Sequence, residues 1–184
     1  MMTAADFIRW YIQHWEGQLS LDPKDRGNWW NGQLVGSKYG ITAAALSSER
    51  QTSHITAFDI AGLTEDEAVS IGLAQYYHAS GLDKLPWNHV TASVLDKAWG
   101  SGPKIAIRLL QGLIGVSPDG VVGDKTIQAY RDWIDKNGEA QAAIIWAKTR
   151  ENFDLSLHQP RFLKGWNNRT TSYLPDGQWW SAMT

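Results

Sequence analysis

The sequence predicts a mainly α-helical protein with about seven helices and a small β-hairpin or sheet near its N-terminus. Three observations predict this class. Apolar residues recur at helical spacing along most of the chain, capping signals precede several of these stretches, and one glycine-rich segment near the N-terminus breaks the pattern. A chain of 184 residues is long enough to bury a sizeable core.

The first helix is expected between Thr3 and Trp15, because the apolar residues there form one stripe of an amphipathic helix. Gly17 is a suitable residue to end it. Residues 21–42 follow, where the Asp-Pro and Asn-Gly pairs and four regularly placed glycines are typical of turns. We therefore expect loops and a short β-hairpin or small sheet in this segment, and a helical piece beginning at Ala43.

Helices account for most of the remaining chain. Thr64 and Glu67 form a capping box, which predicts a helix that runs to about His78. Further helices are expected at residues 91–99, 103–113, 124–135 and 139–157, with a short helical piece at residues 162–168. The segment 115–123 is interpreted as a tight turn region.

Composition excludes several function classes. The net charge of −2 and the lack of a basic stripe argue against nucleic acid as a partner. Cysteine is absent, which excludes disulfides, thiolate metal sites and a cysteine nucleophile. The five histidines lack the spacing of a metal motif, so neither a metal nor another cofactor is expected. Ser47 and Ser48 lack the surroundings of a serine hydrolase nucleophile.

The N-terminal segment indicates neither secretion nor membrane insertion. Asp6, Arg9, His14 and Glu16 interrupt its apolar residues, so we expect no secretory signal and no membrane span.

Aromatic residues suggest a carbohydrate ligand. The chain has 11 tryptophans, and the pairs Trp29–Trp30 and Trp179–Trp180 lie in polar, glycine-rich or terminal segments where burial is harder to arrange. Flat indole faces in such places suit sugar rings, although burial in the core is the alternative. The full set of candidate glycan-binding residues is Trp29, Trp30, Tyr39, Tyr76 and Trp99. At helical spacing with Leu73, either Tyr76 or Tyr77 is instead expected in the core.

Glu16 is the strongest catalytic candidate. It lies at the C-terminal end of the first helix, where its negative charge opposes the helix dipole. Burial beside Trp15 and Tyr11 would also disfavour the charged form, and a raised pKa suits the general acid of glycosidic cleavage. The alternative is a solvated glutamate at a frayed helix end.

A second acidic group is available in the following loop. Glycoside hydrolysis uses two carboxyl groups, and Asp22 and Asp25 lie six and nine residues after Glu16. A turn-forming role is the alternative for each aspartate. The choice between them, and between an inverting and a retaining reaction, is open at this point.

Two segments resemble the N-terminal signature of glycoside hydrolase family 108, namely HWEGQLSLDPKDRG (residues 14–27) and SKYGIT (residues 37–42). The resemblance implies a lysozyme-like α+β fold in which Glu16 is the catalytic glutamate. It also places Ser37 where the family usually has threonine, so that its hydroxyl could hold the attacking water. The chain departs from the pattern at Gln18, Asn28 and Gly100, and by extra residues that include Trp29 and Trp30.

Later segments extend the resemblance. LQ at 110–111 and DGVVG at 119–123 are similar to a peptidoglycan-binding segment, and FLKGWNNR at 162–169 is similar to the C-terminal motif of the family. The implied organisation is a lysozyme-like catalytic part at residues 1–100. A helical peptidoglycan-binding-like segment at residues 101–184 would pack on it as one compact unit.

The resemblance implies an endolysin-type muramidase that hydrolyses the β-1,4 bond between N-acetylmuramic acid and N-acetylglucosamine. Its partner would be the glycan strands of peptidoglycan, and we expect a monomer without stable membrane insertion. By analogy with bacteriophage endolysins, it would be made in the host cytoplasm and reach the cell wall through a holin pore. The alternatives are a lytic transglycosylase and a catalytically silent wall-binding or secretion-related protein.

Overall fold

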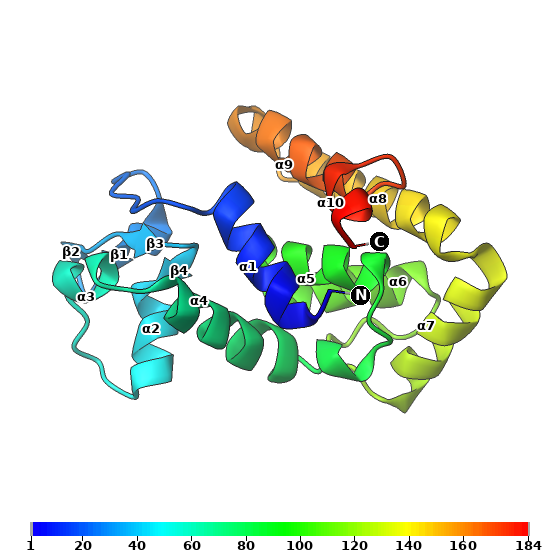
Figure 1. Cartoon of the computed structure of the whole chain (residues 1–184), viewed down its shortest axis with the longest axis horizontal. Helices are drawn as coiled ribbons and strands as arrows, with labels where there is room; N and C mark the ends of the chain where they lie inside the picture. The colour runs from blue at the N-terminus through cyan, green and yellow to red at the C-terminus, as the bar shows by residue number, and fades with distance from the viewer. Residues whose placement is uncertain (1, 184) are drawn as a thin grey trace. The chain divides into compact units, whose positions relative to one another are not determined.

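The computed structural model describes residues 2–183, and this part of the chain is mainly helical (Figure 1). It contains ten α-helices and two antiparallel strand pairs. The contacts divide it into an N-terminal unit of residues 3–75 and a C-terminal unit of residues 76–183 together with residue 2. The expectation of a mainly helical fold with a small N-terminal β element is therefore confirmed.

The first helix, α1, spans Ala4–Trp15 as its apolar stripe predicts. Thr3 and Asp6 form a capping box at its start, and Glu16 is its C-cap residue. Five of its side chains are buried, namely Phe7, Ile8, Trp10, Tyr11 and Ile12. The helix packs on α4 (Glu65–Ile71), to which Arg9 adds a 2.7 Å ion pair with Glu65.

The β element consists of two short hairpins. In the first, β1 (Trp29–Trp30) pairs with β2 (Gln33–Leu34), and Asn31 and Gly32 form the turn with φ of 47° and 78°. Positive φ at both turn residues is the geometry that an Asn-Gly pair favours. In the second, β3 (Ser37–Lys38) pairs with β4 (Ile41–Thr42).

Three helical segments complete the N-terminal unit. Thr42 caps α2 (Ala43–Arg50), and the short α3 (Ala57–Ala61) precedes α4. The expected helix from Thr64 to His78 is present, but α4 continues as a π-helical segment, η2 (Gly72–His78), across the boundary between the units.

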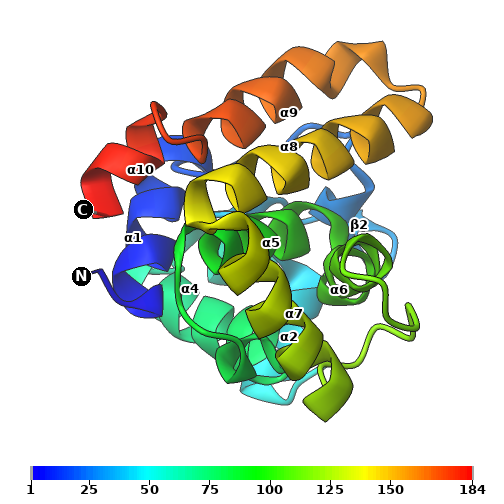
Figure 2. The same ribbon diagram turned by 90° about the vertical axis from the view of Figure 1, so that its right-hand side faces the viewer.

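The C-terminal unit is built around α5 (His89–Ser101), which is buried at every position from His89 to Trp99. The unit continues with α6 (Pro103–Leu113), α7 (Asp124–Asn137), α8 (Glu139–Ser156), α9 (Pro160–Ser172) and α10 (Gln178–Met183). Both α6 and α8 pack on α5, and α9 lies beside α8 as the second arm of a helical hairpin (Figure 2).

The tail is more regular than the sequence suggests. The expected short piece at residues 162–168 is the thirteen-residue helix α9, and α10 was not expected. The expectation that the Trp179–Trp180 pair is poorly buried is wrong for Trp179, which is fully buried and lies edge-on to Tyr173. Trp180 stacks on His89 with ring centroids 3.7 Å apart. Together with the short helix α3, the ordered tail raises the helix count above seven.

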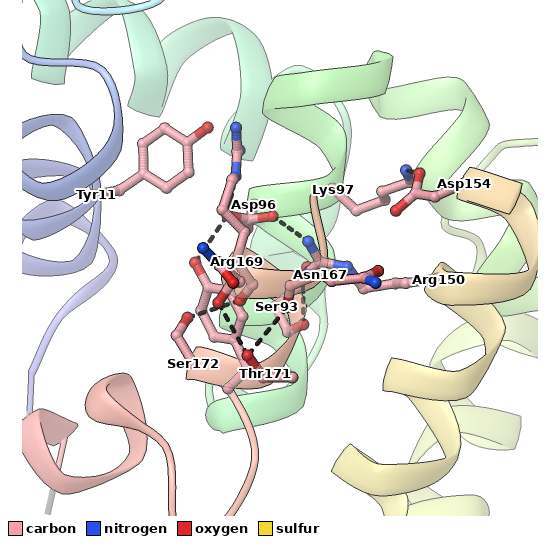
Figure 3. A network of polar contacts seen from close by, with 12 residues as sticks. Tyr11, Ser93, Asp96, Lys97, Arg150, Asp154, Asn167, Arg169, Thr171 and Ser172 are labelled. Carbon is pink, nitrogen blue, oxygen red and sulfur yellow. Dashed lines mark hydrogen bonds and ion pairs between the residues drawn. The ribbon is translucent and has the colours of Figure 1, made fainter. Parts of the chain in front are cut away.

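Charged side chains form part of the core of the C-terminal unit. Asp96 on α5 is 1% exposed and lies between two guanidinium groups, those of Arg150 and Arg169 (Figure 3). Lys97 and Asp154 form a second buried ion pair beside it at 2.5 Å. These contacts join α5 to α8 and α9.

No helix among residues 2–183 combines the length and the apolar character that crossing a lipid bilayer requires.

Candidate active site

Glu16 occupies the position that the sequence predicts, directly after the last residue of α1. Its backbone N–H donates to the carbonyl of Ile12 (3.1 Å), which closes the helix, and its side chain is half-buried. The hydroxyl of Tyr11 donates to Glu16 Oε1 at 2.9 Å. Because Tyr11 itself is 1% exposed and fixed in the core, this hydrogen bond sets the direction of the carboxyl group.

From the sequence, Tyr11 is expected only as an apolar neighbour of Glu16, and this hydrogen bond is not predicted. The two residues are five positions apart, and side chains at that spacing do not share a face within a regular helix. The contact forms because Glu16 has left the helical conformation, with φ of −128° and ψ of 19°.

Both candidate aspartates make turn contacts. Asp22 is half-buried, and its Oδ1 accepts the backbone N–H of Lys24 at 2.9 Å. Asp25 is exposed and caps the short 3₁₀ helix η1 (Arg26–Asn28) by accepting the N–H of Gly27 at 2.8 Å. Each side chain therefore has the conformation of an Asx turn, which fixes one carboxylate oxygen and orients the other.

Asn28 holds this loop in place. The side chain is fully buried, and its Nδ2 donates to both Ser20 Oγ and the carbonyl of Asp22 at 3.0 Å. The backbone carbonyl of Asn28 accepts hydrogen bonds from the N–H groups of Val35 and Gly36, at 2.9 and 3.0 Å. Asn28 thus connects the Asp22 loop to the strands. In the sequence, Asn28 stands out only as a departure from a family glycine.

Ser37 lies in β3, at the point where the same loop meets the hairpin. Ser20 and Ser37 exchange two backbone hydrogen bonds, at 2.8 and 3.0 Å, and form an isolated antiparallel bridge. Gly36 allows this close approach, since a Cβ there would lie 2.7 Å from the carbonyl oxygen of Ser20. The half-buried Ser37 is therefore fixed relative to the loop that carries Asp22.

Two indoles border the loop. Trp29 is 44% exposed, and its indole N–H donates to the carbonyl of Pro23, in the turn between the two aspartates, at 2.9 Å. The Trp30 indole N–H donates to the carbonyl of Ser53 at 2.9 Å. The Trp29 ring is thus held beside the acidic turn and keeps a solvent-accessible surface.

The remaining aromatic candidates occupy different surroundings. Tyr39 is half-buried at the β3–β4 turn with φ of 57°, and the ammonium group of Lys38 lies 5.0 Å from its ring centroid. Tyr76 and Trp99 belong to the C-terminal unit, where their rings stack with centroids 4.8 Å apart. Trp99 is only 8% exposed, so most of its surface is covered by the protein itself.

All four catalytic candidates and three of the five aromatic candidates therefore lie in the N-terminal unit. Within residues 2–183, acidic, histidine and cysteine side chains do not gather in any group of three that would hold a metal ion.

Two protein-family models match the chain. The model described as "Glycosyl hydrolase 108" matches residues 9–102, which include Glu16, Asp22, Asp25 and Ser37. The model described as "Predicted Peptidoglycan domain" matches residues 105–171.

Among solved structures, the SagA protein of Brucella abortus is similar to this chain, with 28% sequence identity and a TM-score of 0.75. The similarity covers 92% of this chain and 90% of that one. None of the curated protein sequences matches.

Proposed function

Because this chain belongs to the glycosyl hydrolase 108 family, we propose that it is a muramidase that acts on bacterial peptidoglycan. The bond cleaved is the β-1,4 linkage between N-acetylmuramic acid and N-acetylglucosamine. The match of residues 105–171 to a peptidoglycan domain supports the cell wall as its substrate. The observation that carries the proposal is the half-buried Glu16 carboxyl, held by Tyr11 at the end of α1.

Glu16 is the proposed general acid, which protonates the bridging oxygen as the glycosidic bond breaks. Its place at the C-terminal end of α1 supports this role, because the helix dipole there disfavours a negative charge. Partial burial acts in the same direction, since it removes water from the charged form. The Tyr11 hydroxyl orients the carboxyl. The hydrogen bond that it donates to Oε1 acts against the other two effects, because it favours the ionised form.

Asp22 or Asp25 supplies the second carboxylate. Asp22 is favoured by its partial burial and by the Asn28 anchor beneath its backbone, and Asp25 is favoured by its solvent access. In either case the carboxylate attacks the sugar or activates a water held by the Ser37 hydroxyl. Trp29 and Trp30 offer indole faces to sugar rings, with Tyr39, Tyr76 and Trp99 as further candidate contacts.

In this proposal, residues 1–100 hold the chemistry and residues 101–184 contribute to wall binding. The biological role is lysis of a bacterial host in the manner of a phage endolysin. Expression in Gram-negative cells should then cause lysis only when the inner membrane is permeabilised, for example by a co-expressed holin. Lysis of equal rate without permeabilisation would contradict the endolysin role.

Replacing Glu16 by glutamine tests the enzymatic proposal, because glutamine keeps the shape of the side chain but its amide is not acidic enough to protonate the leaving oxygen. We expect the release of reducing ends from purified peptidoglycan to fall by about 100-fold or more. The helical circular dichroism signal should be unchanged. Glu49→Gln, the same change at an exposed site on α2, is the matched control and should keep full activity.

Three results would contradict the proposal. Equal activity of Glu16→Gln and the unmodified protein would exclude Glu16 as the acid. Products that end in 1,6-anhydromuramic acid, identified by mass, would identify a lytic transglycosylase. Binding to peptidoglycan without any cleavage by the unmodified protein would leave a wall-binding protein.

A further inference from the structure

A pocket of about 270 Å³ lies within the C-terminal unit, between α5, α6, α8 and α9. Its lining includes neither Glu16 nor any other catalytic candidate of the N-terminal unit. Its volume is below the range of about 300–1,000 Å³ that is usual for sites of drug-sized ligands. The pocket therefore suits a single small ring with its substituents.

The charged groups that line the pocket are engaged in ion pairs. Lys97 pairs with Asp154 at 2.5 Å, and Asp96 contacts the guanidinium groups of both Arg150 and Arg169. All of these residues except Arg169 are buried. A charged ligand would have to compete with these ion pairs for its counterion, at the cost of leaving a buried charge unpaired. The pocket therefore favours a neutral ligand.

The pocket has apolar walls that include a tryptophan. Ile105 and Leu157 are 40% and 36% exposed, and the half-buried Phe153 and Trp166 line the same pocket. Phe162 stacks on Trp166 with ring centroids 5.7 Å apart, which orients the indole. The flat face of an indole suits the C–H face of a sugar ring. The apolar walls suit a methyl group, which is stabilised when it leaves water.

Three polar groups of residues that line the pocket are unpaired and accessible. The indole N–H of Trp166, the hydroxyl of Ser101 and the side-chain amide of Gln159 have no hydrogen-bond partner among residues 2–183. Gln159 is exposed, and the groups of the half-buried Trp166 and Ser101 are not enclosed by the protein. Together they offer both donors and acceptors to a ligand that carries amide and hydroxyl groups.

We propose that this pocket binds an N-acetylglucosamine unit of the glycan strand, with the sugar ring on Trp166 and the acetamido methyl group against the apolar walls. This sugar is neutral, and its amide and hydroxyl groups match the unpaired groups of Trp166, Ser101 and Gln159. The proposal rests on the proposed function in one respect, the choice of peptidoglycan as the source of the sugar. It goes further because it gives the C-terminal unit a sugar-binding site of its own, in addition to the candidates Trp29 and Trp30.

Two variants remove the site in different ways. Gly100→Phe fills the pocket, because Gly100 is an exposed helical glycine of its lining where an added Cβ would meet only Arg169 Nη2, at 3.7 Å. Its matched control is Gly112→Phe, at an exposed glycine on α6 with no atom near an added Cβ. Trp166→Ala removes the indole, and Trp133→Ala removes a half-buried indole on α7 that does not line the pocket.

The test measures binding of two soluble sugars, triacetylchitotriose and cellotriose. They share β-1,4 linkages and differ only in carrying an acetamido or a hydroxyl group on the second carbon of each ring, and neither contains muramic acid. We expect triacetylchitotriose to bind at least tenfold more tightly in calorimetry and to shift the indole N–H signal of Trp166 in NMR spectra. Gly100→Phe and Trp166→Ala should each lose at least tenfold in affinity for it, whereas Gly112→Phe and Trp133→Ala should bind it as the unmodified protein does.

The proposal is overturned if cellotriose binds equally well, if the Trp166 signal does not respond to triacetylchitotriose, or if the control variants lose the same affinity. The NMR shift is measured on the unmodified protein, so the test stays decisive if a variant fails to fold. The result is independent of catalysis, since Glu16→Gln should show the same shift. Cleavage of peptidoglycan without this shift would end this proposal alone, and the shift without cleavage would end only the proposed function.

Discussion

Asn28 is a single residue on which the geometry of the candidate site depends. Its buried amide donates to Ser20 Oγ and to the Asp22 carbonyl, so that one side chain holds two points of the acidic loop. Removal of the amide leaves the Asp22 carbonyl without this donor and opens a space where the fully buried Asn28 side chain lies.

Asn28→Ala is therefore expected to lower the free energy of unfolding by about 1–3 kcal/mol. It should also lower kcat on peptidoglycan more than it raises KM, because the loop moves but the aromatic surfaces remain. Urea unfolding and steady-state kinetics measure the two effects. Asn152→Ala, at an exposed position on α8, is the control and should change neither. Equal free energies of unfolding and equal kcat values for the two variants would show that Asn28 does not hold the Asp22 loop in place.

The sequence predicts the position of Glu16, but it does not predict the roles of Tyr11 and Asn28. The position of Glu16 follows from local rules, since the apolar stripe defines α1 and places the acid at its end. The roles of Tyr11 and Asn28 depend on where the chain turns after the helix and on which strand the loop meets. No periodicity or composition records those contacts, so only the structure could reveal them.

At the scale of elements, turns and caps were the most predictable features. The Asn31–Gly32 pair forms the expected hairpin turn, and the capping box at Thr64 begins α4. The second hairpin turns at Tyr39–Gly40, where a tyrosine adopts a φ of 57° that the residue type does not favour. The sequence predicts only one short hairpin or small sheet in this segment, and the residues of the second turn do not signal it.

The burial of α5 was not predictable from its own residues. A helix that contains adjacent Asp96 and Lys97 would ordinarily present them to water. Both are buried because partners arrive from α8 and α9, more than fifty residues later in the sequence. Local sequence patterns do not predict these long-range ion pairs.

The pair of Lys97 and Asp154 joins α5 to α8, and its side chains are 6% and 3% exposed. Burial lowers the pKa of Lys97, against the stabilising effect of the Asp154 carboxylate. Lys97→Met should lower the free energy of unfolding by about 3–5 kcal/mol, because it leaves a buried carboxylate without a counterion. Chemical denaturation measures this change.

The double variant Lys97→Met/Asp154→Leu should recover most of that loss, since an apolar pair of similar size replaces the ions. Lys148→Met removes a lysine from an exposed pair with Glu151 on the same helix and should cost less than about 1 kcal/mol. If Lys97→Met proves as mild as Lys148→Met, the buried pair does not stabilise the contact between α5 and α8.

At the scale of the whole molecule, the sequence resemblance and the division of the structure do not coincide. The family models change between residues 102 and 105, at the start of α6, whereas the contacts divide the chain between residues 75 and 76. The helix α5 explains the difference. Its sequence belongs to the first family match, but its buried face packs on α6 and α8, which belong to the second. The helices on which α5 packs are determined by the tertiary structure, and the sequence carries no signal of the boundary that results.

The pH dependence of stability should reflect the same buried helix. Burial alone would raise the pKa of Asp96, but the charges of Arg169 and Arg150 overcome this effect and hold it below the ordinary value of 3.8. The native state therefore binds the Asp96 proton more weakly than the unfolded chain does. The stability that this carboxylate contributes is fully present above the unfolded pKa, and it is lost as the pH falls through the lowered native value.

We therefore expect the free energy of unfolding of the protein to fall steeply as the pH decreases from about 5 to 2. Asp96→Asn should be strongly destabilised at pH 7, because two buried guanidinium groups lose their shared counterion, and it should lose less further stability over the acid range. The difference in free energy of unfolding between the two proteins, measured by urea unfolding at each pH, must then narrow as the pH falls.

Other carboxylates, such as Asp59 and Glu67, also have lowered pKa values through their capping contacts, but they are present in both proteins and cancel in the difference. Asp135→Asn, an exposed change on α7, should keep a constant gap of less than about 0.5 kcal/mol at every pH. A gap for Asp96→Asn that stays constant between pH 7 and pH 2 would mean that the Asp96 carboxylate does not stabilise the native C-terminal unit through its charge.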